Sequence, residues 1–497
     1  MPAESSEREL KIDVPFHFAL PDLSPAGVRL EPRPAVQLAA TYWDTADLHL
    51  LRRGITLRYR RGGSHGTKEE DGWTLKLPKR TGGGNGPRLD RTELTWTAPA
   101  DRVPAEALAL VSGVSFGRPL EPVADMVTSR RRWHLLCSNG PVAELDDDDV
   151  VVTTGAQRQS FRQIEVELTG DDERVLQIVA EELQRAGAPP GEAEPKVQRA
   201  FADRLIEHTT RPPLGPRSSL PDAVSAAIRA GLDRLVAHDP GVRLHDEEPE
   251  FVHQARVATR RLRSDLRTLG ADLDPAWLTA TRDELRWMGG LLGDIRDADV
   301  LGERFEARRA RLSGVEQAML DELLARVTSQ RLAAYDRVDE AMASERYHAL
   351  LERLAAPPPF RMTEPAAAAL GPRIRGAWRK LRREVRAAGP QPSDTDLHQI
   401  RIRAKQLRYA AEASAPVLGR SVGRLAEAAA DLQTVLGDHH DAVVAEEWIR
   451  QATVRVRGKG RLLVAGELIG FERVDAAAAK AKWPRAWKAV RRAHKNL

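Results

Sequence analysis

A chain of 497 residues exceeds what one hydrophobic core usually supports, so we expect two or three domains. Apolar residues make up 42% and charged residues 30%, which is typical of a soluble globular protein, and no run approaches the roughly 18 apolar residues of a membrane span. The single cysteine, Cys137, excludes an intramolecular disulfide framework, and the N-terminus lacks a signal-peptide pattern, so a cytoplasmic protein is predicted.

The overall charge of +4 hides an asymmetry between the two halves of the chain. Residues 1–210 carry 27 Lys and Arg against 33 Asp and Glu, a net charge of −6. The rest of the chain carries 49 against 39, a net charge of +10. The second half therefore carries the basic field that would attract a polyanion.

Residues 5–200 are predicted to form mainly strands, because apolar and polar residues alternate along them. The alternation is found in GITLRYR (54–60), GWTLKLP (72–78), RTELTWT (91–97), TSRRRWHLL (128–136) and RQIEVEL (162–168). A helical pattern over 171–187 ends at Gly187, before two prolines. The run 209–222 is rich in Pro, Gly and Ser and predicts a domain boundary.

The polar faces of these predicted strands carry charges that are grouped by sign. The acidic positions are Glu7, Glu9, Glu165 and Glu167, and the basic positions are Lys11, Arg58, Arg60 and Lys76. Carboxylates are preferred ligands of Mg²⁺ and Mn²⁺, and Arg and Lys are preferred ligands of phosphate. Periodicity alone favours a polar sheet face in water, but the grouped charges also suit a site for a metal-bound polyphosphate.

The sequence ERELK at 7–11 resembles the Glu-x-Glu-x-Lys signature of the CYTH family, the triphosphate tunnel metalloenzymes. Further family-like stretches follow in order: YWDTADLHLLRRGITLRYRR (42–61), WTLKLPKR (73–80), RTELT (91–95), ELDDDDV (144–150), RQIEVEL and PKVQRAF (195–201). The resemblance covers residues 5–205 and implies an eight-stranded antiparallel β-barrel with flanking helices and a charged triphosphate tunnel. The charged strand faces would then point inward, and the apolar faces would pack against the helices.

The resemblance also implies metal-dependent hydrolysis of a triphosphate, with Mg²⁺ or Mn²⁺ as the cofactor. The implied catalytic residues are Glu7, Glu9 and Lys11. The implied metal ligands are Glu7, Glu9, Glu165, Glu167 and Asp146. The implied triphosphate contacts are Lys11, Arg58, Arg60, Lys76, Arg91, Arg130, Arg132 and Lys196. Glu93 is expected either to fix Arg91 or to join the metal ligands.

Three positions differ from the family pattern or allow a second interpretation. Pro195 stands where the family usually has a serine before the late lysine, Lys196. In RRRW the register of the functional arginine is ambiguous between positions 130 and 132. Asp44, in YWDT, is interpreted as a turn residue and is left out of the site.

After Asp222 the pattern changes to long helices rich in Ala, Leu and Arg, with an internal repeat. VHQARVATRRLR (252–263) matches LHQIRIRAKQLR (397–408) at an offset of 145, and LGDIRDADV (292–300) matches LGDHHDAVV (436–444) at an offset of 144. Two anchors at nearly the same offset indicate a duplicated helical unit. On a helix, each copy places a histidine and its basic residues on one stripe beside the apolar face.

These helices and both LGDxxDA stretches resemble the CHAD domain over residues 218–497, after a linker over 206–217. The resemblance implies an all-α, pseudo-symmetric helical bundle with a basic cavity for inorganic polyphosphate. The implied polyphosphate contacts are His253, Arg256, Arg260, Arg263, His398, Arg401, Lys405 and Arg408. The aspartates of the LGDxxDA stretches are expected to orient the basic helices, and a metal site at His439 and His440 is disfavoured.

Together these features favour a cytoplasmic CYTH–CHAD protein, associated with polyphosphate granules, that hydrolyses inorganic triphosphate and binds polyphosphate. Thiamine triphosphate and ATP remain alternative substrates, because the residues that the family shares contact only the phosphate groups. The alternative is a non-enzymatic polyphosphate-binding or targeting protein whose barrel only binds anions. No membrane partner is expected, and nucleic acid is disfavoured because no aromatic residues interleave the basic helices.

Overall fold

The computed structural model describes residues 3–62, 71–78, 88–137, 140–170, 172–190, 195–209, 213–245, 248–361, 365–454 and 459–497. Within these ranges the side chains of residues 3–7, 88–90, 206–209, 315 and 459 are outside the description. The chain divides into two compact units, Met1–Arg211 and Pro212–Leu497. The division falls inside segment 206–217, which was predicted as a linker. Part of this segment is helical, however, because α3 (Ala202–Thr209) continues to Thr209 and packs Leu205 against the core of the first unit.

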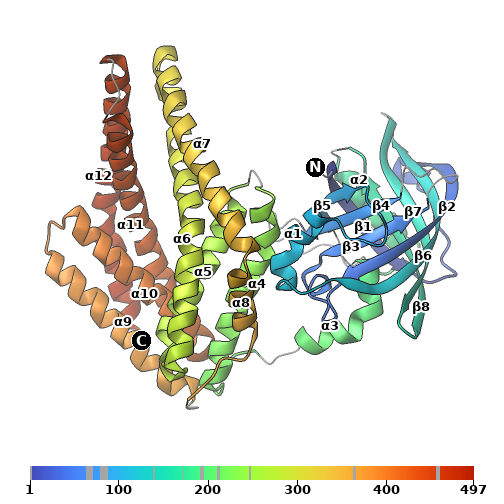
Figure 1. Cartoon of the computed structure of the whole chain (residues 1–497), viewed down its shortest axis with the longest axis horizontal. Coiled ribbons are helices and arrows are strands. Elements are labelled where there is room, and N and C mark those ends of the chain that lie inside the picture. Colours follow the sequence, from blue (N-terminus) through green and yellow to red (C-terminus); the bar gives the residue numbers. More distant parts are fainter. Residues whose placement is uncertain are drawn as a thin grey trace. The chain divides into compact units, whose positions relative to one another are not determined.

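The first unit is built on a closed barrel of eight antiparallel strands, as predicted (Figure 1). The strands are β1 (Ala3–Val14), β2 (Arg29–Asp44), β3 (Thr56–Arg61), β4 (Gly72–Pro78), β5 (Arg88–Trp96), β6 (Glu121–Cys137), β7 (Gly140–Thr154) and β8 (Gln157–Leu168). Their order around the barrel is β1-β5-β4-β3-β2-β6-β7-β8, and β8 closes it by pairing with β1. The other elements are η1 (Ser24–Ala26), η2 (Leu51–Arg53), α1 (Ala105–Ser115), α2 (Arg174–Arg185) and η5 (Lys196–Phe201).

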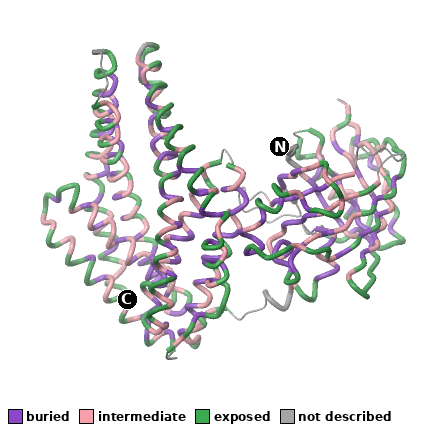
Figure 2. Tube along the Cα trace, viewed as in Figure 1, coloured by how far each residue is buried: buried purple, intermediate pink, exposed green. Residues whose placement is uncertain are grey.

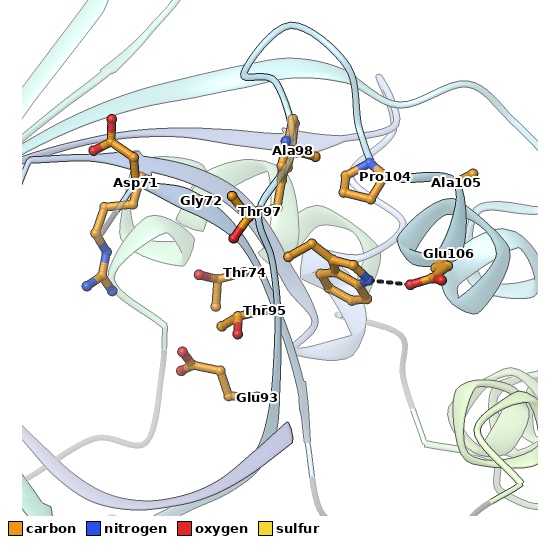
Figure 3. A pocket seen from close by; sticks show the side chains of 13 residues that line it. Asp71, Gly72, Thr74, Glu93, Thr95, Thr97, Ala98, Pro104, Ala105 and Glu106 are labelled. Carbon is orange, nitrogen blue, oxygen red and sulfur yellow. Dashed lines mark hydrogen bonds between the residues drawn. The ribbon is translucent and has the colours of Figure 1, made fainter. Parts of the chain in front are cut away.

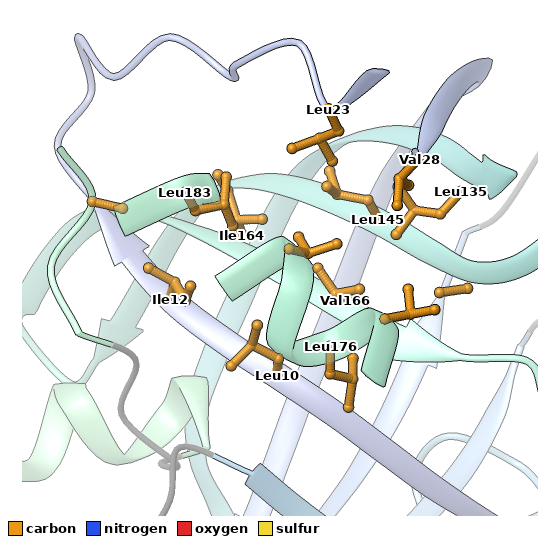
Figure 4. Close-up of a cluster of buried hydrophobic side chains, with 14 of the residues drawn as sticks. Leu10, Ile12, Leu23, Val28, Leu135, Leu145, Ile164, Val166, Leu176 and Leu183 are labelled. Atoms are coloured by element: carbon orange, nitrogen blue, oxygen red, sulfur yellow. The ribbon is translucent and has the colours of Figure 1, made fainter. Parts of the chain in front are cut away.

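The apolar faces of the strands lie outside the barrel and are covered by helix α2 (Figure 4). Leu10 and Ile12 of β1 and Ile164 and Val166 of β8 belong to one buried cluster with Leu176 of α2. Since side chains alternate across a strand, burying the apolar face against α2 turns the charged face of the same strand into the barrel. The prediction that the charged faces point inward is confirmed for this side of the barrel.

At the end of the barrel where β2 ends and β6 begins, the inward-facing side chains are apolar. Farther along β6, β7 and β8, charged side chains face inward. The cluster there contains Tyr42, Met126, Val150, Phe161, Val197 and Phe201. The last two of these residues belong to η5, which therefore covers this end. Among the described residues, the charged part of the interior lies farther along the strands, toward the end where β3 finishes and β4 starts.

The second unit is helical, as predicted. Its helices are α4 (Leu220–Arg243), α5 (Glu250–Leu269), α6 (Pro275–Glu306), α7 (Gly314–Ala343), α8 (Glu345–Ala355), α9 (Ala366–Ala388), α10 (Asp394–Leu418), α11 (Arg420–Thr453) and α12 (Lys459–Lys495), with short turns at η6 (Gly270–Asp272) and η7 (Arg309–Arg311). Buried and exposed residues alternate along the long helices, with the spacing of amphipathic packing (Figure 2). No helix in the described part of the chain is long and apolar enough to cross a membrane.

Local sequence explains where two helices of this unit begin. Ser219 before α4 and Ser393 before α10 each form a capping box, with Asp222 and Asp396 respectively. The two repeated motif pairs lie on α5 with α6 and on α10 with α11. The duplication seen in the sequence is therefore a duplication of paired helices.

Candidate functional site

Strand pairing brings charged positions that are far apart in the sequence next to one another inside the barrel. Lys11 of β1 lies opposite Glu165 of β8, and Glu9 lies opposite Glu167. Glu165 also lies opposite Asp146 of β7. Because these positions share one face of their strands, their side chains converge in the interior.

Glu165 is the centre of a buried ion-pair network. Its carboxylate pairs with Lys11 Nζ, with Lys196 Nζ at 2.8 Å and with Arg130 Nη2 at 3.0 Å, and Lys11 Nζ also lies 2.9 Å from Glu9 Oε2. Burial alone would raise the pKa of Glu165, but the three surrounding cations outweigh it and hold the pKa well below its usual range. Burial would likewise lower the pKa of Lys11, yet the charges of Glu165 and Glu9 hold that pKa above its ordinary value. Glu165 and Lys11 therefore both stay ionised around neutral pH.

The structure settles the register of the three consecutive arginines in β6. Arg131 lies on the outer face, where its guanidinium pairs with Asp147 at 3.0 Å and Asp149 at 3.5 Å and its side chain is 46% exposed. Arg130 and Arg132 lie on the inner face, with side chains 18% and 25% exposed. Both arginines that the sequence left ambiguous are thus inside the barrel, and Arg130 is the deeper one.

Asp148 is a residue of this network that the sequence interpretation missed. Its side chain is fully buried, accepts hydrogen bonds from Arg130 Nε at 2.8 Å and Nη2 at 2.7 Å, and pairs with Lys196. The signal was present in the sequence, because Asp148 has the same strand parity as Glu144 and Asp146. A strand alternates its faces, so the parity that selected Asp146 also selects Asp148.

The proline that precedes Lys196 does not displace this lysine from the site. Pro195 is the N-cap of η5 with φ of −59°, which suits a proline at a helix start. Lys196 follows as the first residue of η5, and its side chain is 9% exposed within the ion-pair network. The departure from the family pattern therefore leaves the predicted phosphate contact in place.

The remaining predicted phosphate contacts lie on β3, β4 and β5. We call them the cationic wall, which consists of Arg58, Arg60, Lys76 and Arg91. Glu93 pairs with Lys76 at 2.9 Å, because these residues are opposite in the strand register. Glu93 therefore fixes Lys76 and not Arg91, while a role of Glu93 among the metal ligands stays a prediction.

Like charges repel one another within the cationic wall. The charge of Arg58, together with burial, lowers the pKa of Arg60 to about 10. Arg91 is 2% exposed, and its Nε has no hydrogen-bond partner among the described residues. An anion placed against this wall would relieve both the repulsion and the missing hydrogen bond.

The carboxylates predicted as metal ligands do not form a group of three or more metal-ligating side chains among the described residues. The physical reason is that Glu165 is held by cations, while Glu167 is exposed and the side chain of Glu7 lies outside the described residues. Two oxygens nevertheless fit a hard cation, since Glu9 Oε1 and Asp146 Oδ1 are buried without a hydrogen-bond partner among the described residues. Burial raises the pKa of Asp146 to about 6, so this carboxylate is largely ionised at neutral pH.

A cavity of about 860 Å³ opens beside the cationic wall (Figure 3). Arg60, Glu93, Thr74 and Thr95 line it from the strands. Farther out, the Trp96 side chain donates a hydrogen bond to Glu106 of α1 at 2.7 Å, drawn as the dashed line in Figure 3. Through Arg60 the cavity adjoins the cationic wall, at the barrel end where β3 finishes and β4 starts.

Asp44 has the structural role predicted for it. Its carboxylate accepts hydrogen bonds from the backbone N–H groups of Thr45 at 2.7 Å, Leu50 at 2.9 Å and Leu51 at 2.9 Å. These bonds shape the turn between β2 and η2. Burial raises the pKa of Asp44 to about 6, against the effect of the three backbone donors.

In the helical unit, the repeated helices α5 and α10 bring four basic residues together. We call them the central basic cluster, which consists of Arg256, Arg260, Arg401 and Lys405. Burial and the nearby charges of Arg401, Arg260 and Arg256 lower the pKa of Lys405 to about 7. Arg260 Nε and Arg401 Nε are both buried without a hydrogen-bond partner among the described residues. Such a cluster presents unsatisfied donors and uncompensated charge to an anion.

The LGDxxDA stretches orient this cluster, as predicted. Asp297 of the first stretch lies 3.3 Å from Arg256, and Asp441 of the second lies 4.0 Å from Arg401. In each repeat, the second aspartate of the LGDxxDA stretch thus contacts the equivalent arginine of the basic helix.

Each predicted histidine has a neighbour that the sequence interpretation missed. The His398 ring lies 4.5 Å from the His440 ring, centroid to centroid, and His440 Nδ1 is 3.3 Å from His398 Nδ1. In the first repeat, the charge of Arg296 acts on His253 and adds to burial in lowering its pKa. Arg296 and His440 occupy equivalent positions at the offset of 144, which was the available signal. The adjacent His439 is 3% exposed and contacts Asp394 at 3.1 Å.

The last predicted contact of each helix has different neighbours in the two repeats. The charges that act on Arg263 are those of Arg286, Arg282 and Asp283 on α6. Arg408 donates a hydrogen bond to Glu412 at 2.6 Å. Arg408 is therefore paired with a carboxylate of its own helix, whereas Arg263 forms no ion pair with a described residue.

Comparison with known proteins agrees with this architecture. A CYTH domain model matches residues 5–201, and a CHAD domain model matches residues 226–450. Two curated relatives are each 33% identical over 500 residues, covering 92% of this chain and 91% of the relative: uncharacterized protein MT2285 of Mycobacterium tuberculosis (strain CDC 1551 / Oshkosh) and uncharacterized protein Rv2226 of Mycobacterium tuberculosis (strain ATCC 25618 / H37Rv). The chain belongs to the family in which a CYTH domain is followed by a CHAD domain.

Two solved structures resemble part of the chain. PptA from Streptomyces chartreusis is 26% identical, with a TM-score of 0.44, over 56% of this chain and 100% of that one. The CHAD domain from the plant Ricinus communis is 24% identical, with a TM-score of 0.47, over 57% of this chain and 95% of that one.

Proposed function

We propose that the N-terminal unit is a metal-dependent triphosphatase that cleaves inorganic triphosphate to pyrophosphate and phosphate. The observation that supports this most is the arrangement of charge inside the barrel. A cationic wall on β3–β5 shares one interior with buried carboxylates on β1, β7 and β8. A barrel that only bound anions would gain nothing from those carboxylates, whereas hydrolysis of a metal-bound triphosphate uses both kinds of group.

Phosphoryl transfer needs mostly positioning and charge stabilisation, which this chain's residues can supply. The cationic wall would bind phosphate oxygens that enter through the cavity beside Arg60. Lys11, Lys196 and Arg130, now paired with carboxylates, would exchange part of that pairing for the substrate. Glu9 and Asp146 would hold Mg²⁺ or Mn²⁺, which when bound neutralises phosphate charge and acidifies water.

The test measures phosphate release from tripolyphosphate at several Mg²⁺ and Mn²⁺ concentrations. Glu9→Gln and Glu7→Gln are expected to abolish metal-dependent release, because each removes a carboxylate charge with little change in shape. Arg130→Ala is expected to do the same, and its neighbour Arg131→Ala, on the outer face, serves as the matched control. Release that is independent of metal, or indifferent to both glutamates, would remove the enzymatic proposal.

One observation favours the non-enzymatic alternative, a barrel that only binds anions. No group of three metal-ligating side chains is assembled among the described residues, and Glu165 is held by cations. On that alternative the wild-type chain binds tripolyphosphate without metal and releases no phosphate. Binding and release measured on the same sample therefore separate the two functions. The same assay repeated with thiamine triphosphate and ATP shows what the barrel accepts beyond the phosphates.

We further propose that the C-terminal unit binds inorganic polyphosphate at the central basic cluster, and that this binding places the protein at cytoplasmic polyphosphate granules. The unsatisfied arginine donors of that cluster support the proposal. In the full chain, Arg256→Ala with Arg401→Ala is expected to weaken long-chain polyphosphate binding. The control is Arg379→Ala with Arg383→Ala, on the exposed face of α9. Competition with RNA at matched ionic strength tests the nucleic-acid alternative, because both bindings depend on salt. Equal binding of RNA would overturn the proposal.

A further inference from the structure

The two repeats have equivalent motifs, but they differ at the C-terminal ends of their basic helices. At the offset of 145, Arg263 of α5 corresponds to Arg408 of α10, and Arg267 corresponds to Glu412. Glu412 accepts hydrogen bonds from Arg408 at 2.6 Å and from Arg261 at 2.7 Å. The basic stripe of α10 is therefore neutralised where it ends.

The stripe of α5 continues instead into a second group of arginines. We call it the distal basic cluster, which consists of Arg263, Arg267, Arg282 and Arg403. Arg263 and Arg267 lie one turn apart on the same face of α5. Burial, followed by the charges of Arg282, Arg263 and Arg403, lowers the pKa of Arg267. Arg403 lies 3.3 Å from Glu384, while the other three members form no ion pair with any described residue. Arg282 Nε is also buried without a hydrogen-bond partner among the described residues.

The distal basic cluster is connected to the central basic cluster along one helix. Arg256, Arg260, Arg263 and Arg267 follow one another on α5 at spacings of four, three and four residues, so they share one face. Eleven residues of helix span about 16 Å, at a rise of about 1.5 Å per residue. A flexible polyanion on the central basic cluster thus meets a continuous line of arginines if it extends along α5. If it extends along α10, it meets Glu412 at the position equivalent to Arg267.

We propose that polyphosphate bound at the central basic cluster leaves it along α5, through the distal basic cluster, and not along α10 past Glu412. The inference rests on the proposed polyphosphate binding and adds a direction to it. Arg267 and Arg282 are contacts for the extended part of a long chain, whereas a short chain is held by the central basic cluster alone. Glu412 makes the pseudo-symmetric path less favourable, because it holds Arg408 and Arg261 in ion pairs and stands where the other repeat has an arginine.

The experiment compares tripolyphosphate and long-chain polyphosphate on the full chain as a function of salt. Each ligand can also bind in the barrel. The binding that is lost in the double variant Arg256→Ala with Arg401→Ala is therefore taken as the binding of the helical unit, and the binding that is left is the constant contribution of the barrel. In Arg267→Gln with Arg282→Gln, the salt slope of long-chain binding is expected to fall by about 0.7 for each lost contact. Tripolyphosphate binding in that component is expected to stay unchanged. Thermal melts of each variant confirm folding, and glutamine keeps part of the side chain's packing.

The control is again Arg379→Ala with Arg383→Ala, which removes two exposed arginines of α9 outside both clusters. An unchanged long-chain slope in Arg267→Gln with Arg282→Gln would overturn the proposed direction. An equal loss for tripolyphosphate, or an equal loss in the α9 control, would overturn it as well. If Arg256→Ala with Arg401→Ala has no effect, the proposed polyphosphate site itself fails, and that outcome is distinct from failure of the direction alone.

Discussion

Substitution of Lys405 should change the pH dependence of polyphosphate binding. Lys405 belongs to the central basic cluster, and burial, followed by the charges of Arg401, Arg260 and Arg256, lowers its pKa to about 7, while Asp441 acts in the opposite direction. The ordinary pKa of a lysine side chain is about 10.4. Free Lys405 is therefore half protonated near pH 7 and largely neutral above it.

The sign and size of the effect follow from this difference. A bound polyanion favours the charged lysine, so binding takes up a proton wherever free Lys405 is neutral. Affinity then falls as pH rises above 7, by about 50-fold between pH 7 and pH 9 for one linked proton, while the bound lysine stays charged. In Lys405→Arg this dependence should disappear, because arginine stays protonated throughout.

The assay is calorimetry with long-chain polyphosphate at pH 7, 8 and 9, at constant ionic strength and in buffers of different ionisation enthalpy, which reports proton uptake directly. The three histidines of the site, His253, His398 and His440, all have pKa values lowered by burial and neighbouring charges, so they titrate below this range. Lys488→Arg, on the exposed surface of α12, is the matched control. If Lys405→Arg loses affinity between pH 7 and 9 as steeply as the parent chain, the reasoning is refuted.

Four further substitutions test the packing described above. Asp148→Asn should lower the free energy of unfolding by about 3–5 kcal/mol and impair phosphate release, because it leaves two buried cations underpaired; chemical denaturation and the release assay check this, and wild-type values in both would contradict it. Gly231→Ala should destabilise the helical unit, since its Cβ would lie 2.5 Å from Leu262, whereas Gly290→Ala, with open space around it, should stabilise α6 by about 1 kcal/mol; thermal melts of both would show the opposite signs. Asp44→Ala should lower the melting temperature because three backbone N–H groups lose their acceptor, and an unchanged melt would show that the turn does not depend on it.

The strands and the long helices could be predicted from periodicity, because a two-residue or a 3.6-residue repeat of apolar positions is a local property of the chain. The same periodicity could not show which face of a strand is buried. The segment RQIEVEL has an apolar face and an acidic face, and its periodicity does not show which of them points into the barrel. Packing of Ile164 and Val166 against α2 settled it and turned Glu165 inward.

The run of four aspartates shows where the prediction of the site stopped. Alternation along β7 places Asp146 and Asp148 on one face of the strand and Asp147 and Asp149 on the other. The alternation does not show which of these faces points into the barrel. Pairing of β7 with β6 and β8 decides it. Glu93 was assigned the wrong partner for the same reason, because its neighbour across the sheet depends on the register of β4 against β5.

In the helical unit, the repeat offset was sufficient to find the basic helices and the aspartates that orient them. It also contained the equivalence of Arg296 and His440, although only the contact of His440 with His398 shows why that equivalence matters. The difference between the ends of the two helices is visible in the sequence as Arg267 against Glu412. Its consequence depends on Arg261 and Arg282, which reach these positions from other turns and other helices.

By itself the sequence determined the two-unit organisation and the strand and helix types, which follow from composition, spacing and local periodicity, and its motifs showed the resemblance to the family that implied most of the charged site positions. Only the tertiary structure decided which charges meet. It paired Glu165 with three cations, placed Asp148 beside Arg130, set Arg60 of the cationic wall at a cavity and paired Arg408 with Glu412. The physical reason is that electrostatic interaction depends on distance through space and on burial, and both are set by strand closure and helix packing between residues far apart in the chain.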